Sequence, residues 1–122
     1  MRPYRRALSE YTIARAEDTG QCEINQRVRQ FLTAKKIDGL SPRTIGNYDD
    51  ILRAFVRHVP SHVDAITTDH VRNYIGYLDM RGLKPSSIQT HINSLRSFFG
   101  WLAVEEIIMR NPMAKIRTVK FD

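Results

Sequence analysis

The sequence predicts an all-α fold of four or five helices, arranged as two helical hairpins. Four stripes of apolar residues with helical spacing run through the chain, and short connections join them. In addition, residues 39–56 and residues 82–102 share a glycine turn, a proline and much of their apolar spacing. A solenoid needs about three or more repeats to bury a continuous core. Two copies therefore predict a pair of hairpins.

Composition limits the classes of protein to which the chain can belong. Lysine and arginine number 19 against 13 aspartates and glutamates, a formal net charge of +6 at pH 7. This balance favours an anionic partner, of which nucleic acid is the commonest. Cys22 is the only cysteine, which excludes an internal disulfide and a cysteine metal cluster and favours a reducing, intracellular setting. No apolar run approaches the ~20 residues of a membrane span, and no secretory signal opens the sequence.

The first segment, residues 1–22, carries several arginines and has no continuous helical stripe. We expect a flexible basic arm there. The first helix is predicted over residues 23–37, where apolar residues follow the spacing i, i+4, i+7 and i+8 from Ile24. Asp38 and Gly39 end this helix with a turn, for which glycine supplies a positive φ.

The second helix is predicted to begin at Ser41, an N-cap residue whose side-chain oxygen can accept from the free amides of the first turn. Pro42 suits the first helical position. The helix should end near His58, because Pro60 disfavours helical backbone in the residue before it. Residues 61–66 are predicted to form a loop.

Thr67 is the predicted cap of the third helix, which should run to about Arg81 and close at Gly82. The fourth helix lies within residues 82–102 and has Pro85 in its first turn. Its outer face differs from the usual solvated face, which carries Glu, Lys and Arg. The residues opposite its apolar stripe are small and uncharged: Ser86, Thr90, Asn93 and Ser97. This face is therefore expected to lie against something polar.

The helical pattern ends before the chain does. Residues 105–109 are predicted to continue the fourth helix or to form a fifth short one, and the helical domain as a whole is assigned to residues 23–110. Asn111-Pro112 then breaks the pattern. Basic and apolar residues alternate after it, but a single strand cannot form a sheet. Residues 111–122 are therefore interpreted as an extended linker toward a part of the protein that this sequence does not contain.

An ordered set of short motifs, none of them diagnostic alone, runs through residues 24–116: Phe31-Leu32, Gly39-Leu40-Ser41-Pro42-Arg43-Thr44, Leu52-Arg53-Ala54-Phe55, Ile66-Thr67-Thr68-Asp69-His70-Val71, Gly82-Leu83-Lys84-Pro85-Ser86-Ser87-Ile88, Leu95-Arg96-Ser97-Phe98-Phe99-Gly100-Trp101-Leu102 and Asn111-Pro112. This set resembles the N-terminal core-binding domain of tyrosine recombinases, also called phage integrases. The resemblance implies a SAM-like bundle of four or five helices that packs on one side of a DNA duplex, with its second and fourth helices entering or bordering the major groove. Lys84 departs from the family pattern, which usually has Ser or Thr at this cap.

The resemblance also implies that catalysis resides elsewhere in the parent protein. The family's chemistry uses a tyrosine nucleophile, two arginines, a lysine and a His-x-x-Arg element, all in a C-terminal catalytic domain. No histidine of this sequence has arginine three residues later. We therefore expect no catalytic residue, no cofactor and no metal site; His58 and His62 lack a third ligand. The implied partners are double-stranded DNA, the catalytic domain of the same parent chain and other protomers of a synaptic complex, in the cytoplasm of a prokaryote or in a phage or mobile-element setting.

The candidates for DNA contact lie at the starts of the second and fourth helices. Free backbone amides and the positive end of the helix dipole favour phosphate there, and hydroxyl groups can bind phosphate oxygens. Asparagine one turn further along can reach base edges, with a preference for adenine. The eight candidates are Arg43, Thr44, Asn47, Lys84, Ser86, Ser87, Thr90 and Asn93.

Other functions remain open. A helical protein-interaction module would use the same face, and it predicts exposed aromatic or methionine side chains there; only Trp101 stands near the end of that face. A helix-turn-helix regulator needs two helices joined by three or four residues, and residues 82–84 supply such a turn. The repeated helix argues against a regulator that reads DNA with one helix. A complete enzyme is rejected, because the sequence has no arrangement of nucleophile and base.

Overall fold

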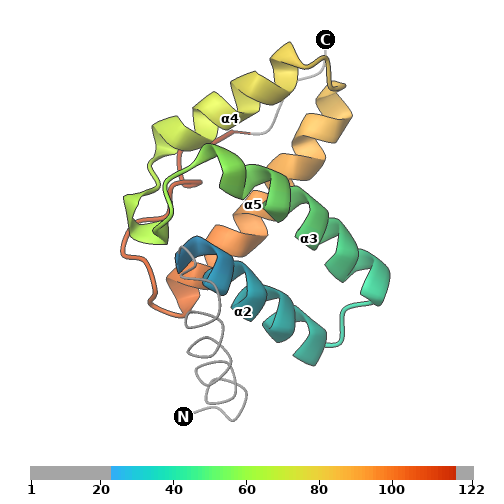
Figure 1. The fold of residues 1–122 in the computed structure, drawn as a ribbon, viewed down its shortest axis with the longest axis vertical. Helices are drawn as coiled ribbons and strands as arrows, with labels where there is room; N and C mark the ends of the chain where they lie inside the picture. The colour runs from blue at the N-terminus through green and yellow to red at the C-terminus, as the bar shows by residue number, and fades with distance from the viewer. Residues whose placement is uncertain (1–22, 118–122) are drawn as a thin grey trace.

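The computed structural model describes residues 23–117 and contains four α-helices in that range (Figure 1). They are α2 (Glu23–Ile37), α3 (Pro42–Phe55), α4 (Thr68–Met80) and α5 (Pro85–Val104). Two short 3-10 helices, η1 (Val56–His58) and η2 (Val63–Ala65), lie between α3 and α4. No strand occurs in the described range, and the all-α prediction is confirmed. The predicted basic arm, residues 1–22, lies outside the described residues, as do residues 118–122.

The chain forms two helical hairpins that cross each other, α2 with α3 and α4 with α5 (Figure 1). In both hairpins, the turn after the first helix begins in the same way. Gly39 and Gly82 have φ values of 92° and 85°, which glycine adopts without the steric cost of a side chain. The next residue then donates its amide to a carbonyl five residues earlier, from Leu40 to Lys35 at 3.1 Å and from Leu83 to Leu78 at 3.2 Å. The likeness seen in the sequence is therefore a repeated helix ending as well as a repeated helix start.

The predicted caps of α3 and α4 are both present. Ser41 Oγ accepts from the amide of Thr44 at 3.2 Å. Thr67 Oγ1 accepts from the amide of His70 at 3.3 Å, and His70 Nδ1 accepts in return from the amide of Thr67 at 2.9 Å. This is a capping box in which histidine stands in for the usual Glu or Gln. The loop predicted over residues 61–66 contains the short helix η2.

Helix α5 is the central element of the core, because it packs against each of the other three helices. Its residues Ile88, Ile92, Leu95, Phe99 and Leu102 are all buried, as the apolar stripe predicts. A chain of edge-to-face aromatic pairs surrounds it, and each such pair contributes about 0.5–1.5 kcal/mol beyond the area that it buries. No helix in the described range is long and apolar enough to cross a membrane.

The prediction of further helix at residues 105–109 is wrong. Glu106 adopts φ 62°, the left-handed conformation that ends a helix, and the amide of Ile107 donates to the carbonyl of Leu102 at 2.9 Å. The chain then turns back instead of continuing along the helix axis. Ile108 is buried against the core as a result.

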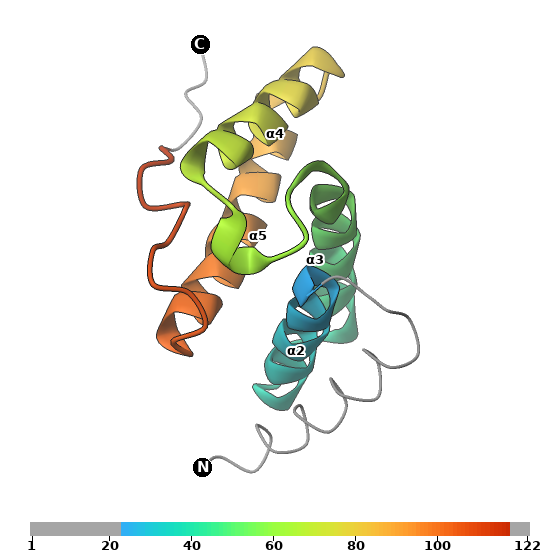
Figure 2. The same cartoon turned by 60° about the vertical axis from the view of Figure 1, so that its left-hand side comes forward.

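Residues 112–115 form a turn where an extended segment was predicted. Met113 is buried in the core, and two hydrogen bonds to backbone carbonyls hold the segment in place. Thr68 Oγ1 donates to the carbonyl of Pro112 at 3.1 Å, and Arg96 Nη2 donates to that of Ile116 at 2.9 Å. Figure 2 shows this segment returning along α5 toward α4. The packed core thus includes side chains beyond residue 110.

Replacing Glu106 by glycine is expected to stabilise the fold. A side chain in the left-handed conformation costs about 1–2 kcal/mol, part of which the greater freedom of glycine in the unfolded chain offsets. We expect Glu106→Gly to raise the free energy of unfolding by about 0.5–1 kcal/mol, measured by urea denaturation. Glu106→Ala is the control, since it removes the carboxylate but keeps the strained Cβ. An equal gain in both variants would attribute the effect to charge and contradict the backbone explanation.

Candidate nucleic-acid interface

The candidate interface lies where α3 and α5 diverge. The hydroxyl oxygens of Tyr48 on α3 and Ser97 on α5 lie 3.2 Å apart in a hydrogen bond that joins the two helices. Thr44 and Asn93 each lie one turn before this contact on their own helix. Toward their first residues the two helices separate, and their starts lie at different corners of the right-hand side of Figure 1. The eight candidate residues all belong to these diverging segments, and we refer to them together as the α3–α5 face.

At the start of α3, the hydroxyl groups of Ser41 and Thr44 are bonded within the helix start itself. Ser41 Oγ accepts from the amide of Thr44 and also donates to Thr44 Oγ1 at 3.0 Å. Thr44 is half-buried, whereas Arg43 and Asn47 are exposed. The amide of Ile45 makes the first backbone bond of this helix, to the carbonyl of Ser41 at 3.0 Å. Because the amide of Thr44 is bound by Ser41, only that of Arg43 is left free in the first turn.

The start of α5 is uncapped. Lys84 occupies the N-cap position with suitable backbone angles, φ −67° and ψ 150°, but its side chain makes no capping bond. The amide of Ile88 makes the first backbone bond, to the carbonyl of Lys84 at 3.0 Å, and Pro85 has no N–H. The two amides of Ser86 and Ser87 are therefore free, and both residues are exposed.

Further along α5, two of the candidates are engaged with their own helix. Thr90 Oγ1 donates to the carbonyl of Ser86 at 3.1 Å, and Asn93 Oδ1 accepts from Gln89 Nε2 at 2.8 Å. A bidentate contact of asparagine with adenine uses both the oxygen and the amide nitrogen. Asn93 must therefore exchange its bond with Gln89 to make such a contact, while its amide hydrogens remain available to an acceptor.

Two residues assigned to the outer face of α5 lie elsewhere. Ser97 is half-buried at the crossing with α3. Trp101 is also half-buried, and its ring packs edge-on against that of Phe31 at a centroid distance of 5.9 Å. The expectation that both stand on an open face is wrong, because α2 and α3 cover that end of the helix. The open polar face of α5 is limited to its first half.

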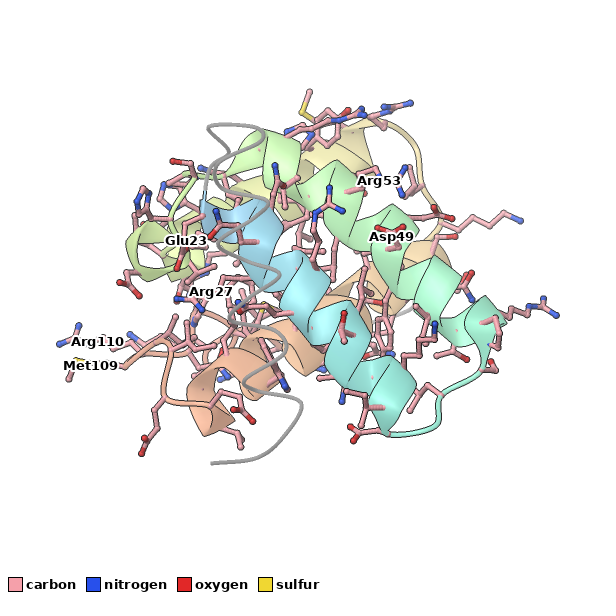
Figure 3. All side chains as sticks on the ribbon, turned by 60° about the horizontal axis from the view of Figure 1, so that its bottom comes forward. Glu23, Arg27, Asp49, Arg53, Met109 and Arg110 are labelled. Carbon is pink, nitrogen blue, oxygen red and sulfur yellow. The ribbon has the colours of Figure 1, made fainter. Side chains whose placement is uncertain are left out.

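The cations of the α3–α5 face are not neutralised by acids in the described part of the chain. Other arginines are paired: Figure 3 shows Glu23 beside Arg27 on α2 and Asp49 beside Arg53 on α3, with N–O distances of 2.8 Å and 2.6 Å. Both pairs lie at the surface and are at least partly exposed, so they stabilise the protein little, but they cancel the local positive field. Arg43 and Lys84 keep their full charge.

Sequence reasoning did not select His91, which lies one turn after Ser87 on α5. Its Nδ1 lies 3.1 Å from the hydroxyl oxygen of Tyr74 on α4, and both side chains are largely shielded from water. Burial raises the pKa of Tyr74 to about 12, with a smaller contribution from Tyr77, and burial lowers the pKa of His91. Both are therefore neutral at pH 7. The two residues are 17 positions apart on different helices, so no spacing in the sequence pairs them.

Residues 27–108 match the family described as the phage integrase N-terminal SAM-like domain. The chain belongs to this family. Within residues 23–117 of this SAM-like domain, no three His, Cys, Asp or Glu side chains lie close enough together to hold a metal ion.

The curated relatives of the SAM-like domain include tyrosine recombinases. It is 36% identical over 88 residues to tyrosine recombinase XerC of Psychromonas ingrahamii, covering 69% of this chain and 29% of the relative. It is 38% identical over 90 residues to XerC of Vibrio vulnificus, covering 68% and 27%, and 31% identical over 97 residues to XerD of Staphylococcus saprophyticus, covering 76% and 32%. The SAM-like domain thus spans about a third of the length of these relatives. No solved structure gives a significant match.

Restoring a capping residue to α5 of the SAM-like domain is expected to stabilise it. The backbone at Lys84 already has N-cap geometry, so Lys84→Ser should add a side-chain bond and raise the free energy of unfolding by about 0.5–1 kcal/mol. Lys84→Ala is the control, since it removes the cation at the positive end of the helix dipole without adding a capping oxygen. It should raise the free energy of unfolding by less than Lys84→Ser does. The reverse change at the equivalent cap of α3, Ser41→Lys, should destabilise by a similar amount. Urea denaturation measures all three; no difference between Lys84→Ser and Lys84→Ala would contradict the missing cap.

The neutral state of His91 predicts a loss of stability in acid. Because its pKa is lower in the folded state than in the unfolded chain, the unfolded chain binds more protons below the ordinary histidine pKa, and stability falls as the pH falls. Between about pH 7.5 and 5.5 we expect the free energy of unfolding to decrease less in His91→Gln than in the wild type. Asn47→Gln, a change at an exposed residue that does not titrate, should keep the wild-type pH dependence. Equal slopes for His91→Gln and the wild type would exclude His91 as a source of acid sensitivity.

Proposed function

We propose that this SAM-like domain is the DNA-binding unit of a site-specific tyrosine recombinase, and that it binds one side of a duplex through the α3–α5 face. The observation that carries the proposal is the family match over residues 27–108, in a chain whose two similar helix starts present unpaired cations and free amides. Curated relatives are named tyrosine recombinases. In this proposal DNA integration or recombination is the task of the parent protein, and the remaining part of that protein supplies the catalytic residues.

The two helix starts are proposed to bind DNA in different ways. At α5, the free amides of Ser86 and Ser87 and the cationic side chain of Lys84 belong to one helix start, which suits a backbone phosphate. At α3, a serine cap occupies one of the amides, so that the side chains of Arg43 and Asn47 provide most of the polar contact. Thr90 and Asn93 lie one turn or more beyond the start of α5, where base edges would come within reach, and Thr44 adds a half-buried hydroxyl group to the start of α3.

The neighbouring segments complete the proposal. Residues 1–22 would act as a basic arm, and residues 111–122 would lead to the catalytic domain of the same parent chain, which together with this domain would surround the duplex. Other protomers would join in a synaptic complex, in the cytoplasm of a prokaryote or during phage infection. Alone, the domain should bind DNA weakly, near the range of non-specific binding, and should not cut it.

The dependence of DNA affinity on salt tests this placement. Each phosphate contact contributes about 0.9 to the slope of log K against log salt concentration. The double variant Arg43→Ala/Lys84→Ala should therefore lower the slope by about 1–2, measured by fluorescence anisotropy with a labelled duplex. Arg72→Ala/Arg110→Ala removes the same charge from other surfaces; Figure 3 places Arg110 at the end of the molecule away from the start of α3.

The slope of the control should stay at the wild-type value. A slope unchanged in Arg43→Ala/Lys84→Ala, or lowered equally in the control, would contradict binding through the α3–α5 face. The single variants also separate this proposal from a helix-turn-helix regulator, since only residues 81–84 join α4 to α5. A regulator that reads DNA with α5 alone would lose affinity in Lys84→Ala but not in Arg43→Ala, whereas the α3–α5 face requires a loss in both.

A further inference from the structure

Beside the α3–α5 face, an open hollow of about 470 Å³ lies between the end of α3, the second half of α4 and the start of α5. Its size is within the range of small-ligand sites, about 300–1,000 Å³. Its polar and aromatic lining consists of Arg57, His58, Tyr74, Tyr77, Arg81 and His91. None of the residues that line it belongs to the α3–α5 face.

The charge of the hollow is positive, and no acid balances it. Neither aspartate nor glutamate is among the residues that line it. Arg27, Arg53 and Arg72 each pair with an acid three or four residues earlier on their own helix. In contrast, Arg57 and Arg81 have no ion pair within the described part of the chain, and both are exposed. The hollow therefore attracts an anion.

The side chain of Arg81 is already ordered for binding. Its Nη1 donates to the hydroxyl oxygen of Tyr77 at 2.9 Å, and the guanidinium carbon lies 5.7 Å from the centre of that ring. The ring of His58 lies 4.2 Å from the ring of Tyr77 between centroids, which supports the tyrosine in turn. A guanidinium has five N–H donors, so the remaining ones are available to a ligand, and little freedom is lost when they bind.

The deeper wall of the hollow is neutral. Tyr74 and His91 are hydrogen-bonded to each other at 3.1 Å and, for the reasons given above, carry no charge at pH 7. Two permanent positive charges, those of Arg57 and Arg81, thus lie at the exposed side of the hollow. This distribution suits a ligand whose negative charge stays beside the exposed arginines. It suits less well a ligand whose charged group would be buried against the neutral wall.

We propose that the hollow binds a backbone phosphate of the duplex that lies on the α3–α5 face, with Arg57 and Arg81 as its ligands. The proposal rests on the proposed function. The hollow is continuous with the α3–α5 face, since Leu83 lines the hollow and is followed directly by Lys84, the N-cap residue of α5. A DNA strand whose phosphate sits on the amides of Ser86 and Ser87 therefore reaches the hollow with a neighbouring phosphate.

Two exposed arginines can be changed without disturbing the core, so the test uses Arg57→Gln, Arg81→Gln and the matched control Arg72→Gln. Affinity for a labelled duplex is measured between about 50 and 200 mM salt. The double variant Arg57→Gln/Arg81→Gln, which loses both ligands of the one phosphate, should lower the slope of log K against log salt by about 0.9. Each single variant should lower it by part of this amount, and the control should leave it unchanged. Circular dichroism checks that all variants fold.

A local readout complements the salt dependence. On addition of the duplex, the NMR signals of the ring protons of His58 and His91 should shift in the wild type and should shift much less in Arg57→Gln/Arg81→Gln. Inorganic phosphate at matched ionic strength should not reproduce the shifts. Shifts of equal size with phosphate alone would identify a site for small anions and overturn the proposal of a DNA contact.

The outcomes distinguish this proposal from the one on which it rests. If Arg43→Ala/Lys84→Ala lowers the salt slope while Arg57→Gln and Arg81→Gln leave it unchanged, the hollow is not a DNA contact and the α3–α5 face stands. If only the hollow variants lower the slope, the duplex lies on the hollow and the α3–α5 face is wrong. If neither set changes the slope, both proposals fail.

Discussion

The arrangement of the domain depends on two neighbouring phenylalanines of α5. Phe98 and Phe99 are both fully buried, yet they contact different helices because successive helical side chains point about 100° apart. Phe98 packs edge-on against Phe31 of α2 at 5.5 Å, and Phe99 packs against Phe55 of α3 at 5.9 Å. The first hairpin is thus held across α5 at two points. With the crossing fixed in this way, the separation between the starts of α3 and α5 is fixed as well.

The helices were predictable because residues close in sequence determine where each helix begins and ends. Ser41 and Thr67 cap the starts of α3 and α4, and Gly39 and Gly82 end α2 and α4. The apolar stripes between these residues determine which side of each helix is buried. The error after α5 has the opposite origin. Glu106 adopts a positive φ although it is not glycine, and the turn allows Ile108 and Met113, which follow it in the chain, to be buried in the core.

The candidate site was predictable only in its local parts. Lys84 and Arg43 could be assigned to helix starts from the sequence, since a proline or a serine marks each start. That Ser97 lies at a helix crossing could not be inferred, because its partner Tyr48 is 49 positions away. The hollow was missed for the same reason: His58, Tyr77 and His91 come from η1, α4 and α5 and acquire a common surface only through the packing of the hairpins.

The uncapped start of α5 has a further consequence. A helix whose first amides have no partner within the protein is incomplete in the free state, and its first turn should open more readily than that of α3. A phosphate bound there would supply the missing acceptor, so that the DNA backbone would take the place of a capping side chain. Binding and folding would then be linked: the domain would reach its full stability only on its target, by an amount that depends on the concentration of DNA relative to the dissociation constant. In the proposed complex, lysine in place of serine at position 84 would thus exchange stability of the free protein for stability of the complex.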